Sequence, residues 1–264
     1  MTKQKTEIQK QLRVRVFAGP NGSGKSTVIK FVKDYKPNGE NIDFGYYINA
    51  DDIAVSLRNG GLHFDTYDLR VTDKEFRKIV LASGLINVQF DEASFEKSYS
   101  LDANIIILID VAAGERMAQI IADFLRKKLL VEREKFSFET VFSHHSKLDI
   151  MREAAEVGYK VYLYFVSTES PEINKFRVLA RKEKGGHDVS PDKIESRYYR
   201  SLELLYEACQ LSYQVYFFDN SLDGVDFKMF AHFKKIGDKK AWDEIDPKMV
   251  PNWFKTYYSN KIQP

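Results

Sequence analysis

A glycine-rich stretch near the start of the sequence has the residue types and spacing of a loop that binds phosphate. It reads GPNGSGKST, in which Gly19, four residues, a second glycine, a lysine and a serine follow one another. In this pattern the glycines let backbone N–H groups point at phosphate oxygens, the lysine reaches the β- and γ-phosphates, and the serine hydroxyl takes a position on Mg²⁺. We therefore expect a bound nucleotide with Mg²⁺, and Ser26 as the residue that contacts the metal. The residues expected to hold this nucleotide are Gly19, Asn21, Gly22, Ser23, Gly24, Lys25, Ser26 and Thr27.

Two adjacent acids, Asp51 and Asp52, follow a short apolar run in the stretch YYINADDIAVSL. A carboxylate in such a place can accept the proton of a substrate hydroxyl as that hydroxyl attacks the γ-phosphate. Aspartate is also a good N-cap, so the alternative is that one of the two caps a helix that begins at Ile53. Adjacent side chains do not point the same way, and we expect one residue in each role.

A basic stretch later in the chain, FRVLARKEKGGHDVSP, predicts a mobile lid at about residues 177–190. Arg177 and Arg181 are four residues apart and would share one face of a helix that Gly185 and Gly186 end. Arginines on a lid can neutralise charge on a phosphoryl group during its transfer. The alternative is a solvated, charged helix end, because such runs are common on protein surfaces.

The elements that must position these residues are strands alternating with helices, which predict a parallel sheet covered on both faces. The glycine-rich stretch has the context that it requires, because a strand precedes it and a helix follows it. Strands are expected at residues 13–18, 46–49, 136–139, 160–166 and 214–218. Ligands of open parallel sheets bind beyond the carboxyl ends of the strands. The residues that follow those ends are Asn49, Asp51, Asp52, Glu139, Thr140, Ser167, Thr168, Asp219 and Asn220.

The expected domain organisation is a polar tail at residues 1–12 and one α/β domain at 13–264. In this domain a three-layer parallel sheet is flanked by helices. A helical insertion is expected at about 57–134, between the second and third strands, with Met117 and nearby apolar residues on one helical face. The segment 240–264 carries both tryptophans and is expected to dock on the body of the domain.

Composition sets further bounds on the function. The 264 residues include 40 basic and 38 acidic ones, so the net charge of +2 gives no general reason to expect a nucleic-acid or membrane partner. The one cysteine, Cys209, lies in an apolar helical face and is expected to be a packed thiol. The N-terminus lacks the apolar core of a secretory signal, and no apolar run approaches the roughly 20 residues of a membrane span. We expect a soluble, cytoplasmic protein.

The ordered set of stretches GPNGSGKST, INADDIA, SFETVFS, GYKVYLYFV and FRVLARKEKGGHDVSPDKIESRYYRSL resembles the zeta toxin family of P-loop kinases. The resemblance covers most of the chain, from Arg13 to Ser221. It implies a P-loop kinase-like fold and a kinase that uses ATP and Mg²⁺. The toxins of this family phosphorylate the 3′-hydroxyl of UDP-N-acetylglucosamine, so the resemblance implies a nucleotide-sugar acceptor and suggests an antitoxin protein as a partner.

The same resemblance implies roles for individual residues of this chain. Asp51 corresponds to the catalytic base, with Asp52 next in line, and Arg181, followed by Arg177, matches the lid arginine. The segment SFETVFS implies substrate contacts by Glu139 and Thr140, and less directly by Ser143. The family's second lid arginine falls where this chain has His187 and Asp188, and the candidates to replace it are Arg197 and Arg200.

Other functions remain open from the sequence. The runs IIILID and YQVYFFD end in Asp110 and Asp219, and an aspartate at the end of an apolar strand can hold the Mg²⁺ of an ATPase or a nucleotide-dependent switch. An inactive nucleotide-binding partner is a third class. A P-loop kinase could instead act on a nucleoside, a polynucleotide end or an antibiotic.

Overall fold

The computed structural model describes residues 11–183, 185 and 189–262 of the chain. Most of the expected tail at 1–12 therefore lies outside the described residues, as do His187 and Asp188 of the expected lid. The chain forms two compact units: unit 1 comprises Met1–Asp43 and Thr140–Pro264, and unit 2 comprises Phe44–Glu139. The insertion expected at about 57–134 falls wholly within unit 2.

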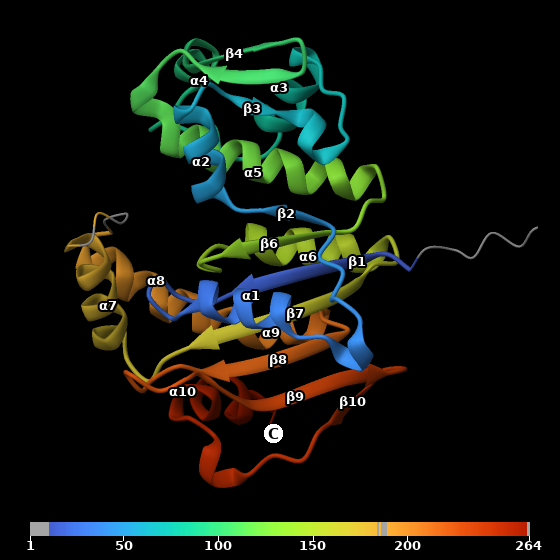
Figure 1. The fold of residues 1–264 in the computed structure, drawn as a ribbon, viewed down its shortest axis with the longest axis vertical. Coiled ribbons are helices and arrows are strands. Elements are labelled where there is room, and N and C mark those ends of the chain that lie inside the picture. The colour runs from blue at the N-terminus through green and yellow to red at the C-terminus, as the bar shows by residue number, and fades with distance from the viewer. Residues whose placement is uncertain (1–10, 184, 186–188, 263–264) are drawn as a thin grey trace, which may run out of the picture. The chain divides into compact units, whose positions relative to one another are not determined.

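Unit 1 is built on a mixed sheet whose central strands are parallel (Figure 1). Its strands lie in the order β10-β9-β8-β7-β1; β1 pairs with β7 and β7 with β8 in parallel, whereas β9 and β10 add an antiparallel edge. The expected α/β fold with a mostly parallel sheet is confirmed. The strands are β1 (Arg13–Ala18), β7 (Lys160–Ser167), β8 (Gln214–Asp219), β9 (Lys228–Ile236) and β10 (Lys239–Trp242).

Helices cover both faces of this sheet, which is why its parallel strands are almost continuously apolar. Helix α1 lies on one face, and α6 and α9 lie on the other (Figure 1). The α-helices of unit 1 are α1 (Lys25–Asp34), α6 (Ser146–Glu156), α7 (Pro171–Glu183), α8 (Pro191–Glu203), α9 (Leu205–Leu211), α10 (Asn252–Phe254) and α11 (Asn260–Ile262). Its short 3-10 and π segments are η1 (Pro37–Gly39), η4 (Pro247–Met249) and η5 (Lys255–Ser259).

The C-terminal segment packs on the sheet of unit 1 through aromatic side chains. Trp253 is 3% exposed and its ring centroid lies 5.9 Å from that of Phe165 in β7. Phe254 and Tyr258 lie 4.9 and 5.6 Å, centroid to centroid, from Phe217 in β8. Rings at these separations gain free energy beyond the burial of their area, so the segment is an integral part of the core.

Unit 2 contains a parallel pair of strands, β2 and β6, and a separate antiparallel sheet in the order β3-β5-β4. Buried phenylalanines, among them Phe76 and Phe124 with centroids 4.9 Å apart, form its core. The strands are β2 (Tyr46–Ile48), β3 (Leu62–His63), β4 (Tyr99–Asp102), β5 (Ile105–Leu108) and β6 (Phe136–Thr140), the last of which ends in unit 1. The helical elements are α2 (Ala50–Arg58), η2 (Phe64–Tyr67), α3 (Asp73–Leu81), α4 (Glu92–Ser98), η3 (Val111–Ala113) and α5 (Gly114–Val131).

The expectation that the 57–134 stretch is helical and irregular is therefore only partly right. Helix α5 lies where the apolar spacing around Met117 predicts it, but the run IIIL forms β5 between two short partner strands. β-branched residues fit a pleated strand well. The partner strands, with two and four residues, are too short to give a recognisable alternation.

Candidate functional site

The loop between β1 and α1 turns through three glycines with positive φ. The φ angles of Gly19, Gly22 and Gly24 are 147°, 76° and 94°, and L side chains rarely adopt such angles. Gly24 is the N-cap of α1, and no side chain among the described residues caps this helix. Its first N–H groups have no partner within the helix. A loop and helix start of this kind favour an anion such as phosphate.

The polar side chains of the loop also fit a phosphate ligand. Lys25 is 7% exposed and its Nζ donates to the main-chain oxygen of Pro20, 3.0 Å away, so the ammonium is held at the loop. Ser26 and Thr27 are exposed in the first turn of α1. Ser23 Oγ and Asn21 Oδ1 are buried and have no hydrogen-bond partner among the described residues. A buried hydroxyl without a partner is costly, and a phosphate oxygen would satisfy the hydroxyl of Ser23.

The rest of unit 1 approaches the glycines too closely for any side chain. A Cβ at Gly19 would lie 2.0 Å from the main-chain oxygen of Val166, and one at Gly22 would lie 2.7 Å from that of Asn174. A Cβ at Gly24 would lie 2.1 Å from Nδ2 of Asn220. The glycines are thus required by both φ and space, and the loop shape is set by residues far away in the sequence.

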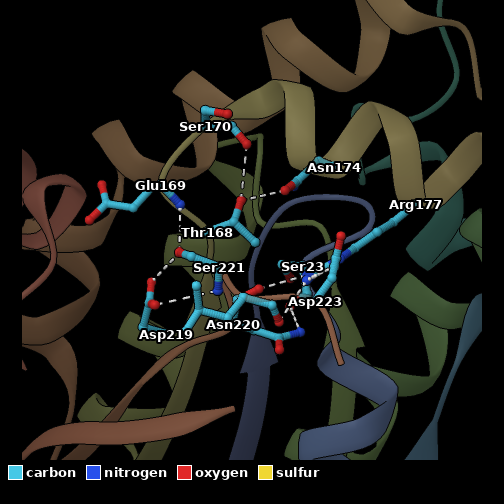
Figure 2. A network of polar contacts seen from close by, with 11 residues as sticks. Ser23, Thr168, Glu169, Ser170, Asn174, Arg177, Asp219, Asn220, Ser221 and Asp223 are labelled. Carbon is cyan, nitrogen blue, oxygen red and sulfur yellow. Dashed lines mark hydrogen bonds and ion pairs between the residues drawn. The ribbon is translucent and has the colours of Figure 1, made fainter. Parts of the chain in front are cut away.

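Two asparagines bind the main chain of the loop directly, and both are labelled in Figure 2 together with Ser23. Asn174 Nδ2 donates to the main-chain oxygen of Asn21 at 2.6 Å, and Asn220 Nδ2 donates to that of Ser23 at 2.9 Å. Asn220 follows β8 and belongs to the residues that the sequence marks for inspection. Asn174 was missed, because it lies inside α7 in a stretch that reads as an ordinary charged helix.

Both arginines of the expected lid lie on α7, four residues apart. Arg177 forms an ion pair with Asp223 at 2.6 Å and donates through Nη1 to the main-chain oxygen of Asn220 at 2.7 Å (Figure 2). It therefore holds the loop that follows β8. Arg181 is exposed one turn further along the same helix. Their role in phosphoryl transfer stays a prediction.

The two aspartates considered as metal ligands make hydrogen bonds within the protein. Asp219 accepts hydrogen bonds at Oδ1 from Trp253 Nε1 at 2.9 Å and from Ser221 Oγ at 2.8 Å. Its other oxygen lies 3.3 Å from the Ser221 N–H. Asp110 caps η3, with its Oδ1 2.9 Å from the N–H of Ala112. Both carboxylates thus have contacts within the protein, and metal binding by either one stays an alternative prediction.

The two adjacent acids of unit 2 lie in the first turn of α2. This helix begins at Ala50, and Asn49 is its N-cap, with Oδ1 accepting from the N–H of Asp51 at 2.8 Å. The expectation that an aspartate caps a helix starting at Ile53 is wrong, because the helix starts three residues earlier. Asp51 and Asp52 are both exposed, at the helix end where negative charge is favourable.

Glu139, at the end of β6, faces a small polar group within unit 2. Its Oε2 lies 3.3 Å from Nδ2 of Asn49 and 3.4 Å from the hydroxyl of Tyr47. Burial, and then the charge of Glu139, raises the pKa of Tyr47 well above its usual value, so this hydroxyl stays protonated. Burial, and then the charge of Asp52, raises the pKa of Tyr67 to about 12. The end of β2 and the start of α2 thus gather carboxylates, an amide and phenols.

The remaining candidates lie in unit 1. Thr140 Oγ1 accepts from the N–H of Phe142 at 3.1 Å, and Phe142 has a φ of 59°. Arg197 and Arg200 lie on α8; burial, and then the charge of Arg200, lowers the pKa of Arg197. Arg200 Nε donates to the main-chain oxygen of Ser196, 3.2 Å away.

Two general properties of the described residues bear on the class of site. They contain no group of three or more His, Cys, Asp or Glu side chains that could hold a metal ion by themselves. None of their helices combines the length and apolar character that crossing a bilayer requires. Cys209 is fully buried and burial raises its pKa, as expected for a packed thiol.

Known proteins resemble this chain more in fold than in sequence. No protein-family model matches it. An uncharacterized protein of Haemophilus influenzae is 29% identical over 91 residues, which are 34% of this chain and 61% of that protein. The solved structure of AvrRxo1-ORF1:AvrRxo1-ORF2 with sulphate ions gives a TM-score of 0.52 at 15% identity, covering 88% of this chain and 60% of that chain. A structure of the PezAT chromosomal toxin-antitoxin system of Streptococcus pneumoniae gives 0.45 at 15% identity, covering 83% and 72%.

The chain thus spans 61% of the Haemophilus protein and 60% of the AvrRxo1 chain. At 15% identity the AvrRxo1 likeness concerns the fold alone. With a TM-score above one half, this chain shares the α/β fold of that structure.

Proposed function

We propose that this chain is an ATP-dependent phosphotransferase that moves the γ-phosphate to a hydroxyl of a small molecule. The observation that carries the proposal is the loop between β1 and α1. Three positive-φ glycines precede a buried lysine at the start of α1, a helix that no side chain of the described residues caps. This arrangement suits a nucleoside triphosphate, because backbone N–H groups and one ammonium can share the charge of its phosphates.

In this proposal the nucleotide is held by the loop from Gly19 to Thr27. Lys25 contacts the β- and γ-phosphates, and Ser26 contributes its hydroxyl to Mg²⁺. Because Mg²⁺ keeps waters and phosphate oxygens as most of its ligands, it needs no dedicated cluster of protein carboxylates. When bound, the ion neutralises part of the phosphate charge.

The acceptor side of the proposal uses the acids of unit 2. Asp51 takes the proton of the attacking hydroxyl, and its exposure in the first turn of α2 leaves the carboxylate accessible to a substrate. Asp52, Glu139 and Thr140 orient the acceptor by hydrogen bonds. The polar cluster of Asn49, Tyr47 and Glu139 supports a hydroxyl-rich acceptor, because it offers both donors and acceptors.

The transferring phosphoryl group is stabilised by Arg181 and Arg177 of α7. Arg181 is the stronger candidate, because it matches the lid arginine that the resemblance implies and its side chain is exposed. Arg177 forms an ion pair with Asp223 and donates to the main-chain oxygen of Asn220. Arg177 would have to leave this ion pair to reach a phosphate. The two arginines are separate side chains, so single substitutions can test their roles one at a time.

The finer assignment follows the resemblance to the zeta toxins. We propose UDP-N-acetylglucosamine or a related nucleotide sugar as the acceptor, and an antitoxin protein as a partner. The similarly folded structure contains two proteins, AvrRxo1-ORF1 and AvrRxo1-ORF2, and a toxin-antitoxin system is among the other neighbours. A nucleoside, a polynucleotide end and an antibiotic are the alternative acceptors.

The test is phosphotransfer from γ-labelled ATP to UDP-N-acetylglucosamine, to a nucleoside panel and to a metabolite extract. The wild-type protein is expected to place label in a new compound rather than release it as phosphate. Asp51→Asn keeps the shape of the side chain and should lower the rate on the order of a hundredfold to ten-thousandfold, with nucleotide binding intact.

Three further substitutions separate this reaction from ATP hydrolysis. Asp52→Asn should cost less than Asp51→Asn, and Asp110→Asn and Asp219→Asn should leave transfer in place apart from effects on stability. Label released only as phosphate, with full activity in Asp51→Asn and its loss in Asp110→Asn or Asp219→Asn, would contradict the kinase and favour an ATPase.

A further inference from the structure

The phosphate loop is held from outside by two asparagine side chains, and no sequence motif points to either role. We propose that Asn174 and Asn220 are positioning residues for nucleotide binding, which fix the direction of two backbone N–H groups in the loop. The inference deepens the proposed function and rests on the loop being the nucleotide site. Both amides come from the same unit as the loop, one from the first half of α7 and one from the residue after β8.

The geometry of a trans peptide explains how a carbonyl contact can orient an N–H group. The C=O of one residue and the N–H of the next share a plane and point in opposite directions. Asn174 holds the C=O of Asn21, so the N–H of Gly22 is directed away from Asn174. Asn220 holds the C=O of Ser23, so the N–H of Gly24 is directed away from Asn220. The two carbonyls that the asparagines hold therefore leave the N–H groups of Gly22 and Gly24 pointing to the side of the loop away from the asparagines.

The glycines at these two peptides permit the anchoring. A Cβ at Gly22 would be 2.7 Å from the main-chain oxygen of Asn174, and a Cβ at Gly24 would be 2.1 Å from Nδ2 of Asn220. Only a residue without a side chain allows the asparagines this close to the loop. The glycine positions of the motif and the two asparagines thus form one arrangement.

The side chain of Asn174 is itself fixed by a buried network (Figure 2). Asn174 and Thr168 are both fully buried, and the Thr168 hydroxyl contacts Oδ1 of Asn174. The hydroxyl of Tyr198 donates to the main-chain oxygen of Thr168 at 2.6 Å. The main-chain oxygen of Asn21 can only accept, so Nδ2 is the atom of the amide that faces it. Oδ1 then meets the Thr168 hydroxyl, which also lies 3.1 Å from the main-chain oxygen of Ser170.

Asn220 is fixed by its main chain. Its N–H donates to the main-chain oxygen of Ser167 at 2.9 Å, and its own oxygen accepts from Arg177, which is paired with Asp223. Asn174 and Arg177 are three residues apart on α7, so they lie on the same face of that helix. One face of α7 therefore anchors the phosphate loop and the loop after β8 together.

The experiment compares wild type with Asn174→Asp and Asn220→Asp, which keep the shape and replace the donor by an acceptor. Calorimetry with ADP, without any phosphate acceptor, should give a dissociation constant raised about tenfold or more in each variant, which is about 1.4 kcal/mol. Hydrogen exchange of residues 19–26 in the nucleotide-free protein should become faster, while exchange in β7 and β8 stays near wild type. The melting temperature of Asn220→Asp, at a half-buried position, should also stay near wild type. In turnover assays, KM for ATP should rise much more than kcat falls.

The matched control is Asn252→Asp. Asn252 is an exposed asparagine of the same unit, and its main-chain N–H, which the substitution leaves in place, donates to Glu169. It should bind ADP as wild type does. Because Asn174 is buried, its variant can fail to fold; Thr168→Val then tests the same anchor by removing the hydroxyl that fixes Asn174, and should raise the ADP dissociation constant severalfold.

Wild-type ADP affinity and unchanged loop exchange in both Asn220→Asp and Thr168→Val would overturn the inference, whatever the phosphate acceptor. A wild-type protein that binds ADP but transfers no phosphate would instead contradict the proposed function. In that case weak ADP binding by the variants still supports the two asparagines as positioning residues.

Discussion

Nδ2 of Asn49 lies 3.3 Å from Oε2 of Glu139, while Oδ1 of the same side chain caps α2 through the N–H of Asp51. One amide thus contacts the acid at the end of β6 and fixes the first turn of the helix that carries the proposed base. In unit 2 the Asn49 side chain therefore supports both Asp51 and Glu139.

Replacing this amide should affect both stability and turnover. Asn49→Ala is expected to lower the free energy of unfolding by about 1 kcal/mol through loss of the cap, and to lower kcat because Asp51 and Glu139 lose their common support. The measurements are urea unfolding and phosphotransfer. Thr72→Ala is the matched control, because Thr72 caps α3 in the same unit through a 3.3 Å bond to the N–H of Glu75. Equal losses of kcat in Asn49→Ala and Thr72→Ala would mean that Asn49 acts only as a helix cap.

Removal of the loop lysine should abolish most of the stabilisation by nucleotide. Lys25→Ala deletes a charge-assisted phosphate contact, and a ligand that binds more weakly shifts the folding equilibrium less. The increase in melting temperature with Mg-ATP should therefore be much smaller than in wild type. Lys30→Ala, an exposed lysine of the same helix, is the control. An undiminished shift in Lys25→Ala would mean that the loop is not the nucleotide site.

The two arginines of α7 should give different kinetic signatures. Arg181→Ala is expected to lower kcat strongly with little change in KM for ATP, because its charge is needed mainly in the transition state. Arg177→Ala releases Asp223 and the loop after β8, so it should also raise KM for ATP. Asp223→Ala should raise KM for ATP as Arg177→Ala does, without a loss of kcat. Turnover that survives in Arg181→Ala would make this arginine a surface residue.

Alkaline unfolding should report the environment of Tyr67. Its pKa is raised from 10.0 to about 12 in the folded protein. The folded state therefore holds the proton more tightly than the unfolded chain, and this contribution to stability is complete below pH 10 and lost as the pH rises toward 12. The slope is at most about 1.4 kcal/mol per pH unit. Tyr67→Phe should unfold with a shallower alkaline dependence than wild type, with Tyr35→Phe as the control for the substitution itself. Identical slopes in wild type and Tyr67→Phe would contradict the assignment.

The sequence predicts those elements of the fold that neighbouring residues in the chain are enough to identify. The strands of the parallel core and α1 are recognisable because apolar runs and a glycine-rich turn lie next to one another in the chain. Strands β9 and β10 and the sheet β3-β5-β4 were not predicted, since charged or very short strands acquire their pairing only from distant partners.

The site divides in the same way. The phosphate loop, Asp51 and Glu139 stand out by type and by position after strands. Asn174 and Asn49 do not stand out in the sequence. A polar residue in a charged helix is expected on the surface, and an asparagine before two aspartates is expected at a helix start. Only the folded chain brings Asn174 to Asn21, 153 positions away, and Asn49 to Glu139, 90 positions away.

This separation has a consequence for protein synthesis. The phosphate loop leaves the ribosome before its supports, because β1 pairs with β7 and the loop is anchored by residues 153 and 197 positions later. Unit 2 is a continuous stretch of the chain and can be completed earlier, since domains fold as units during translation. A nascent or prematurely terminated chain therefore carries the phosphate motif without its anchors. A competent nucleotide site therefore cannot form until residue 220 has been synthesised.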